Sequence, residues 1–368
     1  MPIKKTLFVL SALLLLARWA KGSRAAGTTV DPAMQKVLDR FKAFGGKPIE
    51  TLSPEEARKQ PLPGAAVKAM MSEENLSTPS SATSVTVSHR TISGPVGEFP
   101  IHLYTPPGEG PFPILVYFHG GGFVIAETKD YDASPRALAE GAEAIVVAVD
   151  YHRAPEHKFP AAPTDAYAAY RWVREHAAEF NGDPLQIAVG GESAGGNLAT
   201  VVSMMARDRN EEMPLHQLLI YPVVDNDMTR ESYRINATAA PLNKAMMAWF
   251  FGHYASPRDA LNPYALPLKA GSLADLPDAT VITAEIDPLR SEGKAYAARL
   301  LASGVSVAQR DYAGVTHEFF GMGAVVPAAL DAQRFAIQNL KQAFRQERFR
   351  LSRLQVLQAQ HPGQRQQP

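Results

Sequence analysis

The sequence predicts an α/β protein with a mostly parallel sheet of eight strands, the first of which are antiparallel. Short, largely apolar runs of strand length alternate with helical stretches such as 163–179, 197–207 and 328–344. Runs of this kind are typical of parallel strands that are buried on both faces by helices. The first two runs are separated by Gly and Pro turn residues and predict a hairpin. The expected strands cover residues 85–92, 99–105, 114–118, 144–149, 185–189, 218–221, 279–284 and 305–312.

The bulk composition indicates a globular chain without a charge bias. Its 368 residues are 46% hydrophobic, enough for a sizeable core, and 37 basic side chains balance 37 acidic ones. No overall field therefore attracts nucleic acid or a membrane surface, and we expect neither as a partner. The chain has no cysteine. Disulfides, thiolate metal sites, a cysteine nucleophile and an acylated-cysteine anchor are excluded.

The first 25 residues predict a secretory signal peptide. Lys4 and Lys5 precede an apolar run over 7–17, and small residues follow at Ser23, Ala25 and Ala26. These eleven residues, interrupted only by Ser11, are too few to span a bilayer as a helix. We therefore expect cleavage near Ala26, a secreted or periplasmic protein and no stable membrane span after processing. The basic residues between the apolar run and the small residues leave an uncleaved N-terminal anchor as the alternative; they are Arg18 and Lys21, with Trp19 between them.

Helical segments precede the first strand and interrupt the alternation once. Residues 31–75 are expected to be helical, with Ser53 as an N-cap before Pro54, and 77–84 form a Ser/Thr/Pro linker. Between 225 and 262, a stretch rich in Met and aromatic residues separates two strands. On periodicity alone it is an ordinary core helix, and its position beside the edge that would hold the active site favours a cap. Residues 345–368 carry five Arg against one Glu, and we expect a solvated helix that frays into a basic, disordered tail.

The most informative motif is Gly191-Glu192-Ser193-Ala194-Gly195. It follows an expected strand and opens an expected helix. In that context a G-x-S-x-G sequence predicts a sharp strand-to-helix corner that exposes the serine hydroxyl. Glycines at both ends allow the strand and the helix to pack closely. The motif alone is a weak signal, because Gly and Ser are common in turns, so residues at other strand ends have to support it.

A second motif follows the expected strand over 114–118. It reads His119-Gly120-Gly121-Gly122-Phe123. Three consecutive glycines lose much conformational entropy on folding, so a simple turn seldom uses them. They suit a loop whose backbone N–H groups converge on a small anion, as in the oxyanion loops of lipases and esterases. We expect backbone N–H groups of this loop to act in this way, with His119 and Gly120 as support for the loop.

An acid and a histidine follow two later strands. Asp287 comes after the run over 279–284, and His317 comes after the run over 305–312. Each alone would be read as a surface turn or an exposed loop residue. Together with Ser193 they have the chain order Ser, Asp, His, which is that of an α/β-hydrolase triad. The carboxyl ends of parallel strands meet at one edge of the sheet, so we expect the three side chains to lie close together.

These motifs resemble the bacterial hormone-sensitive lipase family (family IV) of α/β-hydrolase esterases. The resemblance covers about 31–344 and rests on residues 119–123, 150–156, 191–196, 287–293 and 317–319. It implies a hydrolase domain over 85–344, with a cap made from 26–84 and the 225–262 insertion. It implies Ser193 as nucleophile, His317 as base, Asp287 as the group that orients the base, and Gly121, Gly122 and Ala194 as oxyanion donors.

Three positions depart from the family pattern. Glu192 stands where the family commonly has Asp, Ser291 where it often has Asp, and Glu318 where it often has Gly. None of these changes removes a group that the reaction needs. They bear on substrate preference and on the contacts around the triad, and they leave the reaction class unchanged.

The expected activity is hydrolysis of short- to medium-chain acyl esters through an acyl-enzyme. The partner is a small-molecule ester, no metal or cofactor is implied, and a homodimer is left open. An amidase such as an arylformamidase would use the same triad, so it stays as an alternative. A non-catalytic binding protein of the same fold is disfavoured because Ser193 and His317 are both present.

Overall fold

The structure, a computed structural model, describes the backbone of residues 29–74 and 84–360 and the side chains up to residue 350. The expected signal peptide and nearly all of the expected 77–84 linker lie outside these residues. Within the described chain, no helix is both long enough and apolar enough to cross a membrane.

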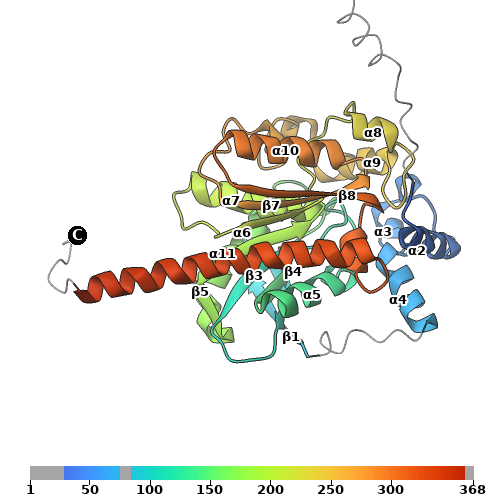
Figure 1. Cartoon of the computed structure of the whole chain (residues 1–368). Coiled ribbons are helices and arrows are strands. Elements are labelled where there is room, and N and C mark those ends of the chain that lie inside the picture. Colours follow the sequence, from blue (N-terminus) through green and yellow to red (C-terminus); the bar gives the residue numbers. More distant parts are fainter. Residues whose placement is uncertain (1–28, 75–83, 361–368) are drawn as a thin grey trace, which may run out of the picture.

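One eight-stranded sheet, in the order β1-β2-β4-β3-β5-β6-β7-β8, forms the centre of the molecule and confirms the predicted fold class (Figure 1). The pairs β1·β2 and β2·β4 are antiparallel, and all other neighbours are parallel. The strands are β1 (Thr86–Ser93), β2 (Glu98–Thr105), β3 (Phe112–Phe118), β4 (Ile145–Val149), β5 (Gly182–Glu192), β6 (Gln217–Ile220), β7 (Ala279–Ile286) and β8 (Val307–Thr316).

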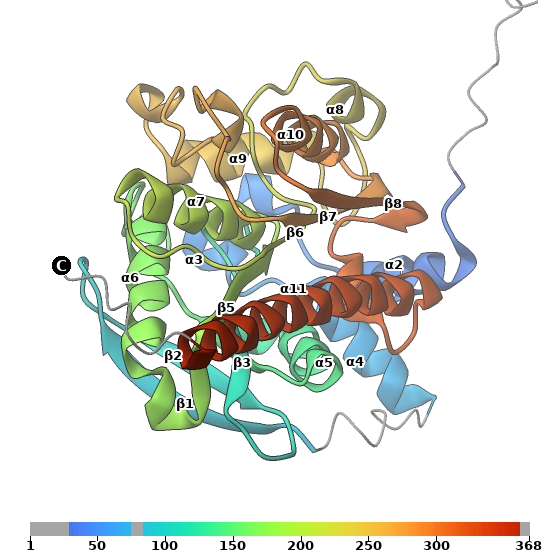
Figure 2. The ribbon, with the colours of Figure 1, turned by 60° about the vertical axis from the view of Figure 1, so that its left-hand side comes forward.

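Helices cover both faces of the sheet, which explains why its central strands are apolar throughout (Figure 2). Every residue of β3 and β4 is buried. Alternate β3 side chains join different cores: Val116 packs with helices α6, α7 and α10, and Tyr117 packs with α5 and α11. These helices are α5 (Ala133–Ala142), α6 (Ala161–His176), α7 (Ala194–Asp208), α10 (Arg290–Ala302) and α11 (Pro327–Gln360).

The N-terminal helices and the insertion meet at one end of the sheet (Figure 1). The Trp249 indole N–H from the insertion donates to the Leu52 carbonyl at 3.1 Å and joins the two segments. Ser53 forms the expected N-cap, with a reciprocal bond to Glu56. The elements are α2 (Pro32–Ala43), α3 (Pro54–Ala57) and α4 (Pro63–Glu73) from the first segment, and α8 (Glu231–Ile235) and α9 (Lys244–Tyr254) from the second.

The last helix is longer than predicted. We expected a core helix to end at residue 344 and a solvated helix to fray beyond it, and α11 continues to Gln360 and runs past the sheet (Figure 1). The sequence of 345–360 is compatible with this length. These residues contain neither Gly nor Pro, and Glu347 pairs with Arg350 at 2.6 Å, a spacing that stabilises a helix.

Candidate active site

The Gly191–Gly195 motif forms the corner between β5 and α7. Ser193 has a left-handed φ of +58°, which is rare for a residue with a side chain. The backbone is fixed from β6, since the Ser193 N–H donates to the Ile220 carbonyl at 2.9 Å. A Cβ on Gly195 would lie 1.9 Å from the Phe118 carbonyl oxygen, and one on Gly191 would lie 2.5 Å from the same atom. Only glycine fits at these two positions, as the sequence predicted.

The three residues predicted from the strand ends form one hydrogen-bonded line. His317 Nε2 lies 2.9 Å from Ser193 Oγ, and His317 Nδ1 lies 2.7 Å from Asp287 Oδ2. The carboxylate on Nδ1 favours a proton there, so the lone pair of Nε2 faces the serine. The other oxygen of Asp287 accepts the Leu289 N–H at 2.8 Å, which fixes the carboxylate just after β7. All three side chains are buried.

The position of His317 depends on a longer last strand than predicted. The strand was expected to end at 312, but β8 continues to Thr316, so His317 follows it directly. A register irregularity between Ala284 and Ile286 accommodates the extra residues of β8 opposite β7. Burial acts to lower the pKa of His317, but the Asp287 charge and hydrogen bond raise it above its ordinary value.

The glycine loop lies against the nucleophile corner. Gly121 and Gly122 have φ values of +90° and +58°. A Cβ would lie 2.2 Å from the Ile125 carbonyl oxygen at Gly121, and 2.3 Å from the Phe250 ring at Gly122. The hydrogen bonds among the described residues leave the N–H groups of Gly121, Gly122 and Ala194 unused. These three donors are therefore free to bind an anion.

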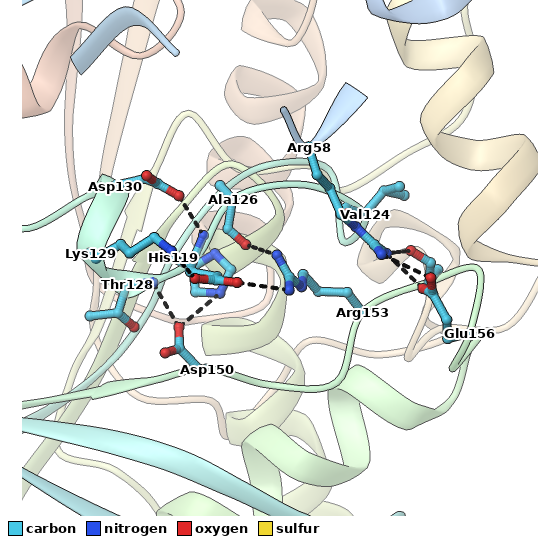
Figure 3. A network of polar contacts seen from close by, with 12 residues as sticks. Arg58, His119, Val124, Ala126, Thr128, Lys129, Asp130, Asp150, Arg153 and Glu156 are labelled. Carbon is cyan, nitrogen blue, oxygen red and sulfur yellow. Dashed lines mark hydrogen bonds and ion pairs between the residues drawn. The ribbon is translucent and has the colours of Figure 1, made fainter. Parts of the chain in front are cut away.

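Behind the loop, Tyr151 and Asp150 contact His119, and the Tyr151 hydroxyl also lies near the Gly120 carbonyl. The His119 ring stacks on Tyr151 with centroids 4.4 Å apart, and the Tyr151 hydroxyl donates to the His119 carbonyl at 3.0 Å. Asp150 accepts from the Thr128 N–H at 2.7 Å, and its carboxylate lies 3.7 Å from His119 Nε2 (Figure 3). Burial acts to raise the pKa of Asp150, but His102, His119 and the Thr128 N–H hold it below its ordinary value.

Two arginines tie the far side of the loop to the rest of the molecule (Figure 3). Arg153 donates to the Ala126 carbonyl at 2.7 Å. Arg58, from the N-terminal segment, donates to the Val124 and Ala154 carbonyls at 2.8 Å each, and its guanidinium binds both oxygens of Glu156. Sequence reasoning missed Arg58, because nothing in its local sequence indicates a contact with a loop 66 positions away.

The three departures from the family pattern take different places. Glu192 is buried behind Ser193, where its carboxylate accepts from the Tyr117 and Tyr221 hydroxyls. Burial, aided by the charge of Glu318, raises the pKa of Glu192 to about 7. Ser291 exchanges hydrogen bonds with Ser232 and joins α10 to α8. Glu318 follows His317 and accepts from the Tyr131 hydroxyl at 2.7 Å.

The serine and the histidine open into a cavity of about 90 Å³. Both predicted cap segments line it, and their side chains are mostly apolar. The residues that sequence reasoning had not assigned to the site are Phe41, Ile49, Leu62 and Pro63 from the N-terminal segment and Leu242, Met246, Met247 and Phe250 from the insertion. Helical periodicity alone does not show that these side chains face a cavity.

Comparison with known proteins agrees with this geometry. Residues 115–321 match a family described as having the alpha/beta hydrolase fold. The chain is 43% identical to esterase LipI of Mycobacterium tuberculosis over 68% of its length and 80% of that protein. It is 34% identical to an ethyl acetate hydrolase of Pseudomonas putida over 80% of its length and 92% of that protein.

The chain belongs to the α/β-hydrolase family. The bacterial hormone-sensitive lipase branch expected from the motifs is confirmed, and the chain is an enzyme of the serine hydrolase class. A solved thermostable esterase from Pseudomonas putida covers 86% of this hydrolase and 98% of its own chain, with 35% identity and a TM-score of 0.78.

The corner of this hydrolase should not accept a side chain at position 195. Gly195→Ala forces the β5–α7 corner away from β3, and we expect the free energy of unfolding to fall by about 3 kcal/mol or more. Gly252→Ala is the matched control, because its Cβ would meet nothing within 4 Å in helix α9. That variant should gain up to about 1 kcal/mol. Denaturant unfolding measures both, and equal stability of Gly195→Ala and the parent would contradict the packing described here.

Arg58 should control the rigidity of the glycine loop. Hydrogen bonds to a charged group contribute about 1.5–3 kcal/mol each, so Arg58→Ala should speed amide hydrogen exchange over residues 120–126 at least about tenfold. Arg40→Ala, which removes a cap ion pair with Glu73, is the control and should leave that loop unchanged. Unaltered loop exchange in Arg58→Ala would show that the arginine does not hold it.

Proposed function

We propose that the enzyme hydrolyses carboxylic esters with Ser193 as nucleophile, His317 as general base and Asp287 as the group that orients the base. The observation that carries the proposal is the hydrogen-bonded line from Asp287 through His317 to Ser193, which ends at a cavity beside three unused N–H groups. A nucleophile, an oriented base and oxyanion donors are the groups that acyl transfer requires. The relatives that bear names of esterases support the same class of reaction.

The reaction follows from these positions. His317 Nε2 takes the proton of Ser193 Oγ while Oγ bonds to the ester carbonyl carbon, and the carbonyl π electrons move to its oxygen. The N–H groups of Gly121, Gly122 and Ala194 donate to that oxyanion, and one such donor contributes about 10²–10³ in rate in serine proteases. The oxyanion then collapses, the bond to the alkoxy group breaks, and His317 protonates the leaving alcohol.

Water repeats the sequence on the acyl-enzyme. His317 takes a proton from the water, whose oxygen attacks the acyl carbon, and returns a proton to Ser193 as the acid leaves. Asp287 stays ionised throughout and stabilises the imidazolium that forms in both halves. The burial of Asp287 excludes water from its carboxylate and strengthens this effect.

The cavity favours short acyl chains. The cavity measures only about 90 Å³, which suits a short acyl group better than a long one. The lining from the two helical segments is apolar, which suits alkyl groups on the acyl or alcohol side. We infer that these segments act as a cap that limits chain length.

Export is a separate proposal. It rests on the basic start, the short apolar run and the small residues before Ala26, as in a secretory signal peptide. Residues 1–25 lie outside the described part of the chain, so the proposal stands on the sequence. Under this proposal, the mature hydrolase is secreted or periplasmic.

A substrate series tests the proposed function. We expect kcat/KM to be highest for p-nitrophenyl acetate to hexanoate and to fall steeply for laurate, because longer chains exceed the cavity. Ser193→Ala should lower kcat by about 10⁴-fold or more. The p-nitroanilides with the same acyl groups should react far more slowly. Undiminished turnover by Ser193→Ala would refute the mechanism, a preference for laurate would refute the chain-length limit, and faster cleavage of the anilides would favour an amidase.

A further inference from the structure

Glu318 has a backbone conformation that a side chain makes unfavourable. Its φ is +69° and its ψ is 5°, in the left-handed region where glycine fits best. The residue stands between His317 and a 3₁₀ helix over Phe319–Met322, so the turn itself is needed to leave the strand. Glycine would make this turn without strain. A glutamate that is kept in a strained position next to the catalytic histidine indicates a role for its side chain.

The Glu318 carboxylate lies beside the reacting atoms. Its Oε1 is 3.9 Å from His317 Nε2 and accepts the Tyr131 hydroxyl at 2.7 Å, and its side chain is only 20% exposed. Glu318 also lines the cavity together with Ser193. Asp287 binds the opposite nitrogen of the same ring. The imidazole of His317 therefore lies between two carboxylates, with Asp287 hydrogen-bonded to Nδ1 and Glu318 near Nε2.

We propose that Glu318 is a second carboxylate that stabilises the His317 imidazolium, in addition to Asp287; this inference rests on the proposed function. When His317 Nε2 takes the Ser193 proton, a positive charge forms 3.9 Å from Glu318 Oε1. Coulomb attraction at that distance in a buried site favours the charged ring. Glu318 acts through His317, and the Tyr131 hydroxyl holds its carboxylate at the edge of the ring. Its effect is on the energy of the proton transfer.

Several other titratable groups face His317 and Glu318, and their charges affect the pKa values of both residues. Burial acts to raise the pKa of Glu318, whereas His317 and the Tyr131 hydroxyl oppose the rise. The charge of Glu318 in turn raises the pKa of both His317 and Glu192. Burial raises the pKa of the nearby tyrosines well above the ordinary value, so they remain donors. The facing groups are Asp287 after β7, Glu192 at the end of β5, Tyr117 on β3, Tyr131 before α5, Tyr221 after β6 and Ser193.

Glu318→Gln is the direct test, because glutamine keeps the length and an oxygen for Tyr131 and removes only the charge. The proposed reaction needs His317 in its neutral form, which is lost by protonation as the pH falls through the pKa of His317. The Glu318 carboxylate raises that pKa, so the parent enzyme loses activity at a higher pH. The acid limb of the kcat/KM profile should therefore move to lower pH by about one unit in Glu318→Gln. At the plateau kcat should fall about tenfold, with KM nearly unchanged, because the lost attraction acts on the imidazolium.

Three controls separate this effect from others. Glu318→Asp keeps the charge, and its acid limb should lie nearer to the parent than to Glu318→Gln. Glu192 also titrates near neutrality, so the Gln substitution is repeated in a Glu192→Gln background, where the shift should persist. Glu179→Gln removes an exposed carboxylate paired with Arg90 and His176, and it should leave the profile unchanged.

A titration that needs no turnover distinguishes this inference from the proposed function. The imidazole of His317, followed by nitrogen NMR, should lose its proton at a pH about one unit lower in Glu318→Gln than in the parent, whether or not esters are hydrolysed. An unchanged His317 pKa together with an unchanged plateau kcat would overturn the inference. A change in KM alone would also overturn it, because it would show that Glu318 only shapes the cavity.

Discussion

The close approach of the β5–α7 corner to the end of β3 is the constraint on which the site depends. At Gly195 the helix comes so near the Phe118 carbonyl that no side chain fits between them. This contact places the Ala194 N–H beside the glycine loop that continues from β3, and it turns Ser193 out of the sheet. Because the strands are parallel, the ends of β7 and β8 reach the same edge and supply Asp287 and His317. Backbone packing thus determines where the side chains of the site lie relative to one another.

The charges around His317 are the second feature on which the site depends. Three carboxylates surround one imidazole in a buried site: Asp287 on one nitrogen, Glu318 near the other, and Glu192 behind the nucleophile. Burial opposes ionisation of Glu192 and Glu318, and hydroxyl donors counter it in part. The neighbouring carboxylates raise the pKa of His317 and so favour a protonated ring, which is the species that the proposed mechanism forms when the serine attacks. The arginines that hold the glycine loop lie on its other side, where they stabilise carbonyls and not the ring.

The fold, and the meeting of Ser193, Asp287 and His317 at one edge of the sheet, could be predicted from the sequence, because both follow local patterns. Apolar runs mark buried strands, and Ser193, Asp287 and His317 each follow one of them. The contacts of Arg58, the tyrosines that hold Glu192, and the cavity lining could not, since they join segments that are far apart in the chain. The length of the last helix could not be predicted for a different reason: the basic, Gln-rich composition after residue 344 favours fraying, while the absence of Gly and Pro over 345–360 favours a helix. Periodicity identifies helices and strands, but their partners depend on tertiary packing.

Covalent labelling tests the central claim, that Ser193 is the nucleophile, most directly. A fluorophosphonate reacts with an activated serine: the hydroxyl oxygen bonds to phosphorus, fluoride leaves, and His317 accepts the hydroxyl proton. Intact-mass measurement of the full chain should show one adduct per molecule, and peptide mapping should place it on Ser193. Heat-unfolded protein should not react, because the label requires the oriented base. An adduct on another residue, or none on the folded enzyme, would contradict the account.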